Sequence, residues 1–196
     1  MTLPLPSSRN ARVDIVVQGS LPATGGVVSS CTLVRDGAHV MVVDPGMAPS
    51  VAAILEPLAA LGVQPEDVTE VILTHHHPDH AMHAGHFPNA AVHDHWAIYR
   101  GTDWEHSEGD GREVSPSVRL ARTPGHTAED LAVLIGTPEG IVACTHAWYE
   151  DGSPIEDEEP EDAEQMRASR AAIREVADRI IPGHGPAFRP SEPKSR

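Results

Sequence analysis

The sequence predicts an α/β protein whose strands and helices form layers. Two observations carry this prediction: short segments rich in β-branched residues alternate with segments of helical periodicity, and a group of strands followed by a helix occurs twice along the chain. The chain has 196 residues, which is enough for one domain with a sizeable core. We therefore expect a single domain over residues 1–196.

The chain up to residue 73 is predicted to contain four strands and one helix. Residues 51–62 have apolar positions at helical spacing and end at Gly62, although Pro57 should kink or divide this helix. The apolar strand at 71–73 is typical of a central position that is covered on both faces. The other strands are expected at 13–17, 30–34 and 39–43, the last two joined as a hairpin across Asp36–Gly37.

The rest of the chain adds further strands and a second helix. Residues 101–111 are polar and rich in glycine, so we expect an exposed loop there. Residues 165–173 contain many helix formers and follow an acidic run at 156–164, which suits the N-terminal end of a helix dipole. Strands are expected at 91–93, 117–122, 131–135, 140–144 and 176–181.

The charge balance excludes several classes of partner. Lys and Arg total 14 against 29 Asp and Glu, so the formal net charge is −15 and the chain has no general attraction for DNA, RNA or anionic lipid. No apolar run approaches the roughly 20 residues of a membrane-spanning helix. Cys31 and Cys144 are expected to be buried as small apolar residues, neither paired nor nucleophilic. With no secretory pattern at the N-terminus, these features favour a cytoplasmic protein.

Histidine is the unusual residue type in this chain. There are 13 histidines, and six of them lie between His75 and His86. Alternate residues of an extended segment face the same way, so His75 and His77 should project together while His76 points elsewhere. Pro78 then turns the chain and places two more donors at the start of a helix. Imidazole and carboxylate groups suit Zn, Fe, Mn or Ni, and the expected ligands are His75, His77, Asp79 and His80.

Three further histidines follow predicted strands and are expected to join the same site. His126 and His184 each follow a Pro-Gly pair, and a glycine beside a ligand lets the backbone approach a crowded centre. His146 follows the strand at 140–144. Asp44 and Thr74 are expected to support the ligands, or to serve only as a turn cap and a strand end. His83 and His86 are expected one turn apart on the helix after Pro78, either at the surface or supporting the ligands.

This pattern resembles the metallo-β-lactamase superfamily. The motif His-x-His-x-Asp-His at 75–80, followed later by single histidines, carries the resemblance, together with the turn Asp-Pro-Gly at 44–46. A closer likeness to one group within the superfamily lies in the segments 87–90, 123–126 and 181–189. The resemblance covers a core at about 13–189, and it implies a four-layer αββα sandwich with a two-metal site at one edge of its sheets.

By the same resemblance, two metal positions are expected. The first would be held by His75, His77 and His126, and the second by Asp79, His80 and His184. The chain departs from the family at His146, which stands where an aspartate normally bridges the two metals. A neutral imidazole offers one lone pair and leaves the site with one more positive charge. We therefore expect one or two divalent ions, zinc before Fe, Ni or Mn, with His146 as a further ligand and the second ion bound weakly or absent.

The predicted activity is metal-dependent hydrolysis of a small ester, thioester or lactone. A bound metal lowers the pKa of its water and supplies hydroxide at neutral pH. Asp79 could orient this nucleophile and then pass a proton to the leaving group. The chain has no room for the helical substrate domain of glyoxalase II-type thioesterases or for the inserted domain of many family nucleases. We expect a small-molecule substrate and no membrane or nucleic-acid partner, and we assign no oligomeric state.

Three alternatives stay open at this point. The first is a mononuclear iron dioxygenase, since persulfide dioxygenases share the superfamily. The second is a phosphodiesterase or nuclease, against which the charge of −15 argues. The third is a metal-binding module without turnover, which the departure at His146 suggests.

Overall fold

Two β-sheets form the centre of the molecule in the computed structural model, which describes residues 1–23 and 25–190. The first sheet has seven strands in the order β1 (Arg12–Val17), β2 (Cys31–Asp36), β3 (His39–Val43), β4 (Glu70–Ile72), β5 (Ala91–His93), β6 (Ala97–Arg100) and β7 (Asp103–His106). The second has five, in the order β12 (Arg179–Ile181), β11 (Gly140–Cys144), β10 (Leu131–Thr137), β9 (Val118–Arg122) and β8 (Glu113–Ser115).

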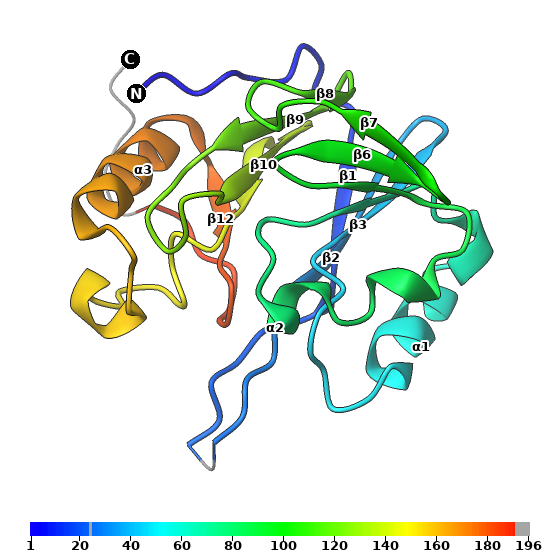
Figure 1. Ribbon diagram of the computed structural model, residues 1–196, viewed down its shortest axis with the longest axis horizontal. Coiled ribbons are helices and arrows are strands. Elements are labelled where there is room, and N and C mark those ends of the chain that lie inside the picture. The colour runs from blue at the N-terminus through cyan, green and yellow to red at the C-terminus, as the bar shows by residue number, and fades with distance from the viewer. Residues whose placement is uncertain (24, 191–196) are drawn as a thin grey trace.

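Helices cover the outer faces of both sheets. The helices are α1 (Ala52–Ala60), α2 (Pro78–Ala81) and α3 (Ala163–Val176), with short 3-10 turns η1 (Pro65–Asp67), η2 (Ala84–His86) and η3 (Ile155–Glu158). Figure 1 shows α1 and α3 on opposite sides of the two sheets. None of the helices in the described part of the chain has the length and apolar character needed to cross a membrane.

Three apolar clusters hold these layers together. Buried side chains of the two sheets, such as Met41 and Val133, pack against each other in the middle of the sandwich. Ile54 of α1 packs in a cluster with Leu33 on the outer face of the first sheet. Ile173 of α3 packs in a corresponding apolar cluster on the outer face of the second sheet. The order helix, sheet, sheet, helix confirms the predicted αββα sandwich.

Parallel strand pairing determines where the loops meet. The neighbours β3, β4 and β5 run parallel, so their C-terminal ends lie at one edge of the first sheet. The strands β11 and β12 are also parallel, and both end at one edge of the second sheet. The segments that follow these strands carry Asp44, the 74–80 segment, His146 and His184. Residues far apart in sequence are thereby brought to a common edge.

The structure confirms most predicted elements and corrects several boundaries. The helix α1 is one undivided helix despite Pro57, because Ile54 and Leu58 on either side of the proline are both buried in the same cluster. The helix α3 continues to Val176, so β12 begins only at Arg179. Its N-cap is Asp162, whose carboxylate accepts hydrogen bonds from two backbone N–H groups of the first turn.

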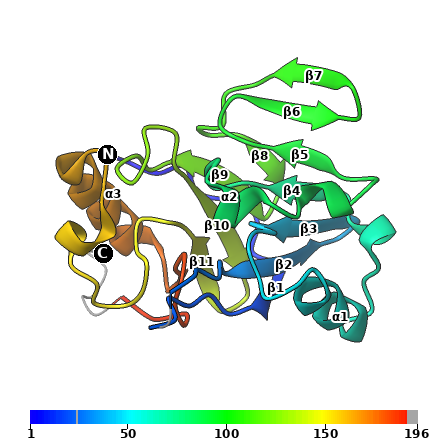
Figure 2. The same ribbon diagram turned by 60° about the horizontal axis from the view of Figure 1, so that its bottom comes forward.

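Two other predictions were wrong. Residues 101–111 do not form a loop throughout, because β7 pairs with β6 as a hairpin that projects from the end of the first sheet (Figure 2). All four residues of β7 are exposed. Because the strand has no buried face, its sequence lacks the alternation of apolar and polar residues that indicates a strand. The helix after Pro78 ends at Ala81, and His83 and His86 therefore do not lie on it.

Candidate metal centre

The loops after β4, β9, β11 and β12 bring histidine rings together at one edge of the sandwich. The ring centroid of His75 lies 4.7 Å from that of His77 and 5.1 Å from that of His126. Those of His80 and His184 lie 5.3 Å apart. The side chains brought together here are the predicted His75, His77, Asp79, His80, His126, His146 and His184.

His146 lies at the centre of this group. Its ring centroid is 4.1 Å from that of His126, 4.6 Å from those of His75 and His80, and 4.9 Å from that of His184. Two sets of donor atoms, each within 4.8 Å of one another, both include it. The sets are Asp79, His80, His146 and His184, and His75, His126 and His146. A side chain that belongs to both sets is a candidate ligand for either.

Hydrogen bonds from neighbouring residues fix the orientation of two of these imidazole rings. One carboxylate oxygen of Asp44 accepts from the backbone N–H of Thr74 at 2.8 Å, and the other accepts from the Thr74 hydroxyl at 2.7 Å. The second oxygen also lies 2.9 Å from Nδ1 of His80. Nδ1 of His75 lies 3.1 Å from the same hydroxyl. With Nδ1 as the donor in both rings, Nε2 keeps its lone pair for a metal.

His184 is oriented in the same way by the backbone. Its Nδ1 donates to the Val28 carbonyl at 3.1 Å, which leaves Nε2 facing Nε2 of His146 at 3.0 Å. An Asp79 carboxylate oxygen lies 3.5 Å from Nε2 of His184 and 3.5 Å from Nε2 of His80. Three imidazole nitrogens and one carboxylate oxygen therefore point toward a common volume.

His77 and His126 form a close pair at the outer side of the site. Nδ1 of His77 lies 3.0 Å from Nε2 of His126, close to the separation of about 3.3 Å between two nitrogens bound to one tetrahedral zinc ion. His77 is exposed and His126 is buried, so the site opens to solvent on the side of His77. A small molecule can therefore approach from that side.

The electrostatics of the rings fit a metal rather than a cluster of positive charges. Burial, followed by the neighbouring imidazoles, lowers the pKa values of His75 and His146 well below their ordinary range. Burial and the nearby His77 lower the pKa of His126 to about 4. Nε2 of His75 and His80 and Nδ1 of His126 and His146 are buried without a hydrogen-bond partner. Neutral imidazoles with unpartnered nitrogens are the donors that divalent transition metals require.

Two glycines allow the backbone to approach this centre. A Cβ atom on Gly46 would lie 1.7 Å from the carbonyl oxygen of Asp79, to which Met47 donates a backbone hydrogen bond of 2.7 Å. A Cβ atom on Gly183 would lie 2.5 Å from the His146 ring. The His146 imidazole therefore fits only because the residue before His184 has no side chain.

Sequence reasoning missed Tyr149. Its ring centroid lies 5.2 Å from that of His146, 5.3 Å from that of His184 and 5.8 Å from that of His126. Burial, followed by the charge of Glu158, raises the pKa of this hydroxyl, which therefore stays protonated at neutral pH. The only signal for Tyr149 in the sequence was its position three residues after His146. Without the fold, that position does not indicate that the side chain lies near the histidines.

The predicted supporting residues divide into two groups. Asp44 and Thr74 contact the predicted ligands His75 and His80, as described above. His83 and His86 lie against each other, with ring centroids 5.3 Å apart, and belong to neither set of donor atoms. Cys31 and Cys144 are buried in apolar clusters, as predicted, and burial raises the pKa of Cys144 to about 12.

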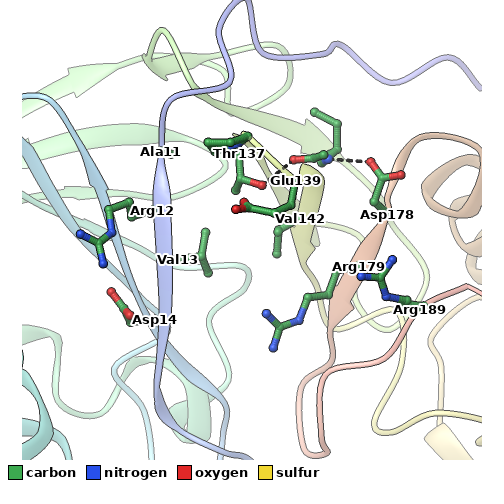
Figure 3. A pocket seen from close by; sticks show the side chains of 13 residues that line it. Ala11, Arg12, Val13, Asp14, Thr137, Glu139, Val142, Asp178, Arg179 and Arg189 are labelled. Atoms are coloured by element: carbon green, nitrogen blue, oxygen red, sulfur yellow. Dashed lines mark hydrogen bonds between the residues drawn. The ribbon is translucent and has the colours of Figure 1, made fainter.

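A cavity of about 550 Å³ lies elsewhere, between the start of β1, the β10–β11 turn and the start of β12 (Figure 3). Gly140 lines it at the first residue of β11, whereas His146 follows the last residue of that strand. Asp178 faces it and accepts a hydrogen bond from the Ile141 backbone N–H at 2.7 Å. No histidine is among the residues that line this cavity. The candidate metal-binding side chains lie instead at the other end of β11.

Comparison with known proteins gives a consistent result. A family model described as the metallo-beta-lactamase superfamily matches residues 24–146. The chain is 34% identical over 195 residues to metallo-beta-lactamase domain-containing protein 1 of Xenopus laevis, covering 90% of this chain and 81% of that one. It is 37% identical over 162 residues to the Homo sapiens protein of the same name, covering 76% of this chain and 59% of the human one. These matches confirm the closer likeness within the superfamily.

More distant matches include hydrolases. A hydroxyacylglutathione hydrolase of Aeromonas hydrophila is 36% identical over 131 residues, covering 61% of this chain and 46% of its own. A Thermotoga maritima structure described as a metallo-beta-lactamase has a TM-score of 0.70 at 19% identity, covering 93% of this chain and all of its own. A quorum-quenching N-acyl homoserine lactone lactonase has a TM-score of 0.62 at 23% identity, covering 94% of this chain and 93% of its own. At these identities the two structures show a shared fold.

Proposed function

This chain belongs to the metallo-β-lactamase superfamily and is a metallo-hydrolase, and we propose that it acts on a small ester, thioester or lactone. The observation that carries the proposal is the convergence of neutral histidine rings with the half-buried carboxylate of Asp79 beside an opening to solvent. The relatives support a small acyl substrate, because one is named for hydroxyacylglutathione and a similar structure for an N-acyl homoserine lactone. The net charge of −15 disfavours a polyanionic substrate.

The proposed metal ligands are the seven residues of the centre: His75, His77, Asp79, His80, His126, His146 and His184. Zinc is the favoured ion, since imidazole and carboxylate are its usual ligands at catalytic sites. A divalent ion bound there supplies Lewis acidity and a nucleophilic hydroxide at neutral pH. Because Asp79 is the only carboxylate in either donor set, we propose that one ion binds tightly and the second weakly.

Two side chains of the protein are placed to move or donate protons. The carboxylate of Asp79 is half-buried and lies at the edge of the donor set, where it can accept the proton of an attacking water and return it to the leaving group. The hydroxyl of Tyr149 stays protonated and belongs to a ring packed against three imidazoles. It can donate a hydrogen bond to the oxygen that gains charge as the acyl carbon is attacked.

Two measurements test this proposal. They are elemental analysis of protein purified without added metal, and assays on a generic thioester and a generic lactone. We expect hydrolysis that a chelator stops and zinc restores. Replacing Asp79 by asparagine should lower kcat by about 100-fold or more. An Arg179→Ala variant, whose side chain lines the distant cavity, is the control and should retain wild-type activity. Metal-loaded protein that hydrolyses neither substrate would contradict the proposal.

A second candidate follows from the composition of one donor set. Three of its four members, Asp79, His80 and His184, provide two imidazoles and one carboxylate, the combination that binds Fe(II) in many oxygenases, and His146 adds a third imidazole. In that case the iron-loaded protein should consume oxygen with a sulfur-containing substrate, and the zinc-loaded protein should not hydrolyse esters. Oxygen uptake with iron-loaded and zinc-loaded samples distinguishes the two functions.

The location in the cell is also a proposal. Cys31 and Cys144 are both free thiols buried in the apolar layers of the sandwich. Small buried thiols of this kind support a reducing compartment such as the cytoplasm. Immunofluorescence of the tagged protein in its host cell tests this assignment.

A further inference from the structure

A second group of side chains of the types that bind metals includes one residue of the 75–77 segment and shares no residue with the two donor sets described above. It consists of His76, His95 and Glu129, all half-buried. Nδ1 of His76 lies 2.7 Å from one Glu129 carboxylate oxygen, and Nε2 of His95 lies 3.4 Å from the other. One donor atom from each residue lies within 4.8 Å of the other two. No role for these three side chains follows from the hydrolytic site.

Asp94 fixes the orientation of His76. Its Oδ2 lies 3.0 Å from Nε2 of His76 and accepts the hydroxyl of Tyr99 at 2.7 Å. Its Oδ1 accepts the backbone N–H groups of Trp96 and Ala97 at 2.7 and 2.8 Å. With Nε2 of His76 held by this anchored carboxylate, Nδ1 is the ring atom that faces Glu129. A carboxylate behind an imidazole in this way is the usual arrangement at histidine–metal bonds.

We propose that His76, His95 and Glu129 bind a divalent transition-metal ion at a site separate from the hydrolytic centre. The ligand atoms are Nδ1 of His76, Nε2 of His95 and the Glu129 carboxylate, and water completes the coordination. Two imidazoles and one carboxylate suit Zn, Co or Ni rather than Mg or Ca. The ion would bridge Nδ1 of His76 and the Glu129 carboxylate in place of their direct contact of 2.7 Å.

A metal ion at this position would connect segments that are far apart in the sequence. His76 lies between His75 and His77, and Glu129 belongs to the 123–130 segment that carries His126. An ion at the second site would therefore cross-link two segments that supply ligands to the hydrolytic centre. The third ligand, His95, follows β5 and ties both segments to the first sheet. We expect the ion to stabilise the folded protein by binding only to the native arrangement.

Trp96 provides a direct optical reporter of this site. Its ring centroid lies 4.3 Å from that of His95 and 5.0 Å from that of His76. The chain has two other tryptophans: Trp148 is buried against α3, and Trp104 lies on the projecting β7 strand. An open-shell ion such as Co²⁺ bound next to His95 should quench the fluorescence of Trp96.

The test is a Co²⁺ titration of zinc-loaded, desalted protein, followed by tryptophan fluorescence. We expect saturable quenching in the wild type that excess Zn²⁺ reverses and that Trp96→Phe loses. His95→Asn and Glu129→Gln should each weaken the apparent affinity by about tenfold or more. The matched control is His106→Asn, an exposed histidine on β7 whose removal should leave the titration unchanged. Circular dichroism of each variant verifies folding.

The outcomes are independent of the hydrolytic activity. Equal quenching in the wild type, His95→Asn and Glu129→Gln would overturn the second site, as would the absence of any Trp96-dependent quenching. Native mass spectrometry provides a second readout, in which the wild type binds one ion more than either ligand variant at the same Zn²⁺ concentration. Equal ion counts in all three proteins would also reject the proposal while leaving the hydrolytic centre intact.

Discussion

Nε2 of His146 lies 3.0 Å from Nε2 of His184 at the centre of the candidate metal site. His184 donates its Nδ1 proton to the Val28 carbonyl, so the lone pair on its Nε2 points directly at His146. Two lone pairs at this distance repel, and either a proton or a cation must lie near the contact. His146 is therefore oriented as a partner of the position formed by Asp79, His80 and His184. An aspartate would reach both metal positions with separate oxygens, which one imidazole nitrogen does not do.

Replacing His146 by aspartate should increase the number of ions that the protein holds. The carboxylate adds one negative charge and a second ligand atom, and both reduce the repulsion between neighbouring divalent ions. We expect about one tightly bound ion per chain in the wild type and close to two in His146→Asp, measured by elemental analysis after desalting. His146→Asn removes the imidazole without adding charge and should not raise the count. Two ions in the wild type, or one in His146→Asp, would contradict this view.

Asp44→Asn should weaken metal binding although Asp44 is not a ligand. The Asp44 carboxylate accepts three hydrogen bonds, from two groups of Thr74 and from Nδ1 of His80, and an amide oxygen cannot replace both oxygens. We expect a loss of about 10-fold to 100-fold in zinc affinity, measured by competition with a chromogenic chelator.

The control for this experiment is another buried aspartate with a similar environment. Asp36 accepts hydrogen bonds from the Ser115 hydroxyl at 2.7 Å and the Ser117 backbone at 3.0 Å, away from the metal site. Asp36→Asn should lower stability without changing the zinc affinity. An equal loss of affinity in both variants would mean that Asp44 acts only through general stability.

Glu158→Ala should destabilise the protein strongly. Glu158 is fully buried, and its carboxylate lies 2.6 Å from the Arg170 guanidinium, which is also buried. Removing the acid leaves a buried charge without its partner, at a cost of about 3 kcal/mol or more in the free energy of unfolding. Urea denaturation measures this cost. The double variant Glu158→Ala/Arg170→Leu should recover part of the loss, and a single variant as stable as the wild type would contradict the expectation.

Tyr99→Phe should reveal a pH-dependent contribution of Asp94 to stability. Burial acts to raise the pKa of Asp94, but hydrogen bonds from His76, Tyr99 and the backbone of Ala97 and Trp96 outweigh it and lower the pKa to about 2. Because the pKa of Asp94 is lower in the folded state than its ordinary value of 3.8, ionised Asp94 stabilises the fold above pH 3.8, and this contribution is lost as the pH falls toward 2.

The measurement is the difference in unfolding free energy between wild type and Tyr99→Phe across this pH range. We expect about 1 kcal/mol near neutral pH, because Tyr99 donates to a charged oxygen at a partly exposed position. The difference should shrink as Asp94 becomes protonated. A difference that stays constant down to about pH 2 would show that the hydroxyl contributes independently of the Asp94 charge.

Sequence periodicity predicted the strands with buried faces more reliably than the exposed ones. The strand β10 is buried along its whole length and lies where the run of apolar residues indicates. The sequence predicted a loop at the exposed strand β7, because the pairing of β7 with β6 depends on backbone hydrogen bonds and not on an apolar face. Pro57 was expected to kink or divide its helix, but packing on both sides of the proline keeps the helix undivided.

The sequence by itself determined which residue types could bind metal, because their spacing after apolar strands is a local property. It also indicated that His75 and His77 face one way and His76 another, since alternation in an extended chain needs no knowledge of the fold. Only the tertiary structure decided that His146 lies between two donor sets, that Asp44 reaches both Thr74 and His80, and that His76 meets Glu129. These contacts join segments that follow different strands, so they depend on how the two sheets place those strand ends in space.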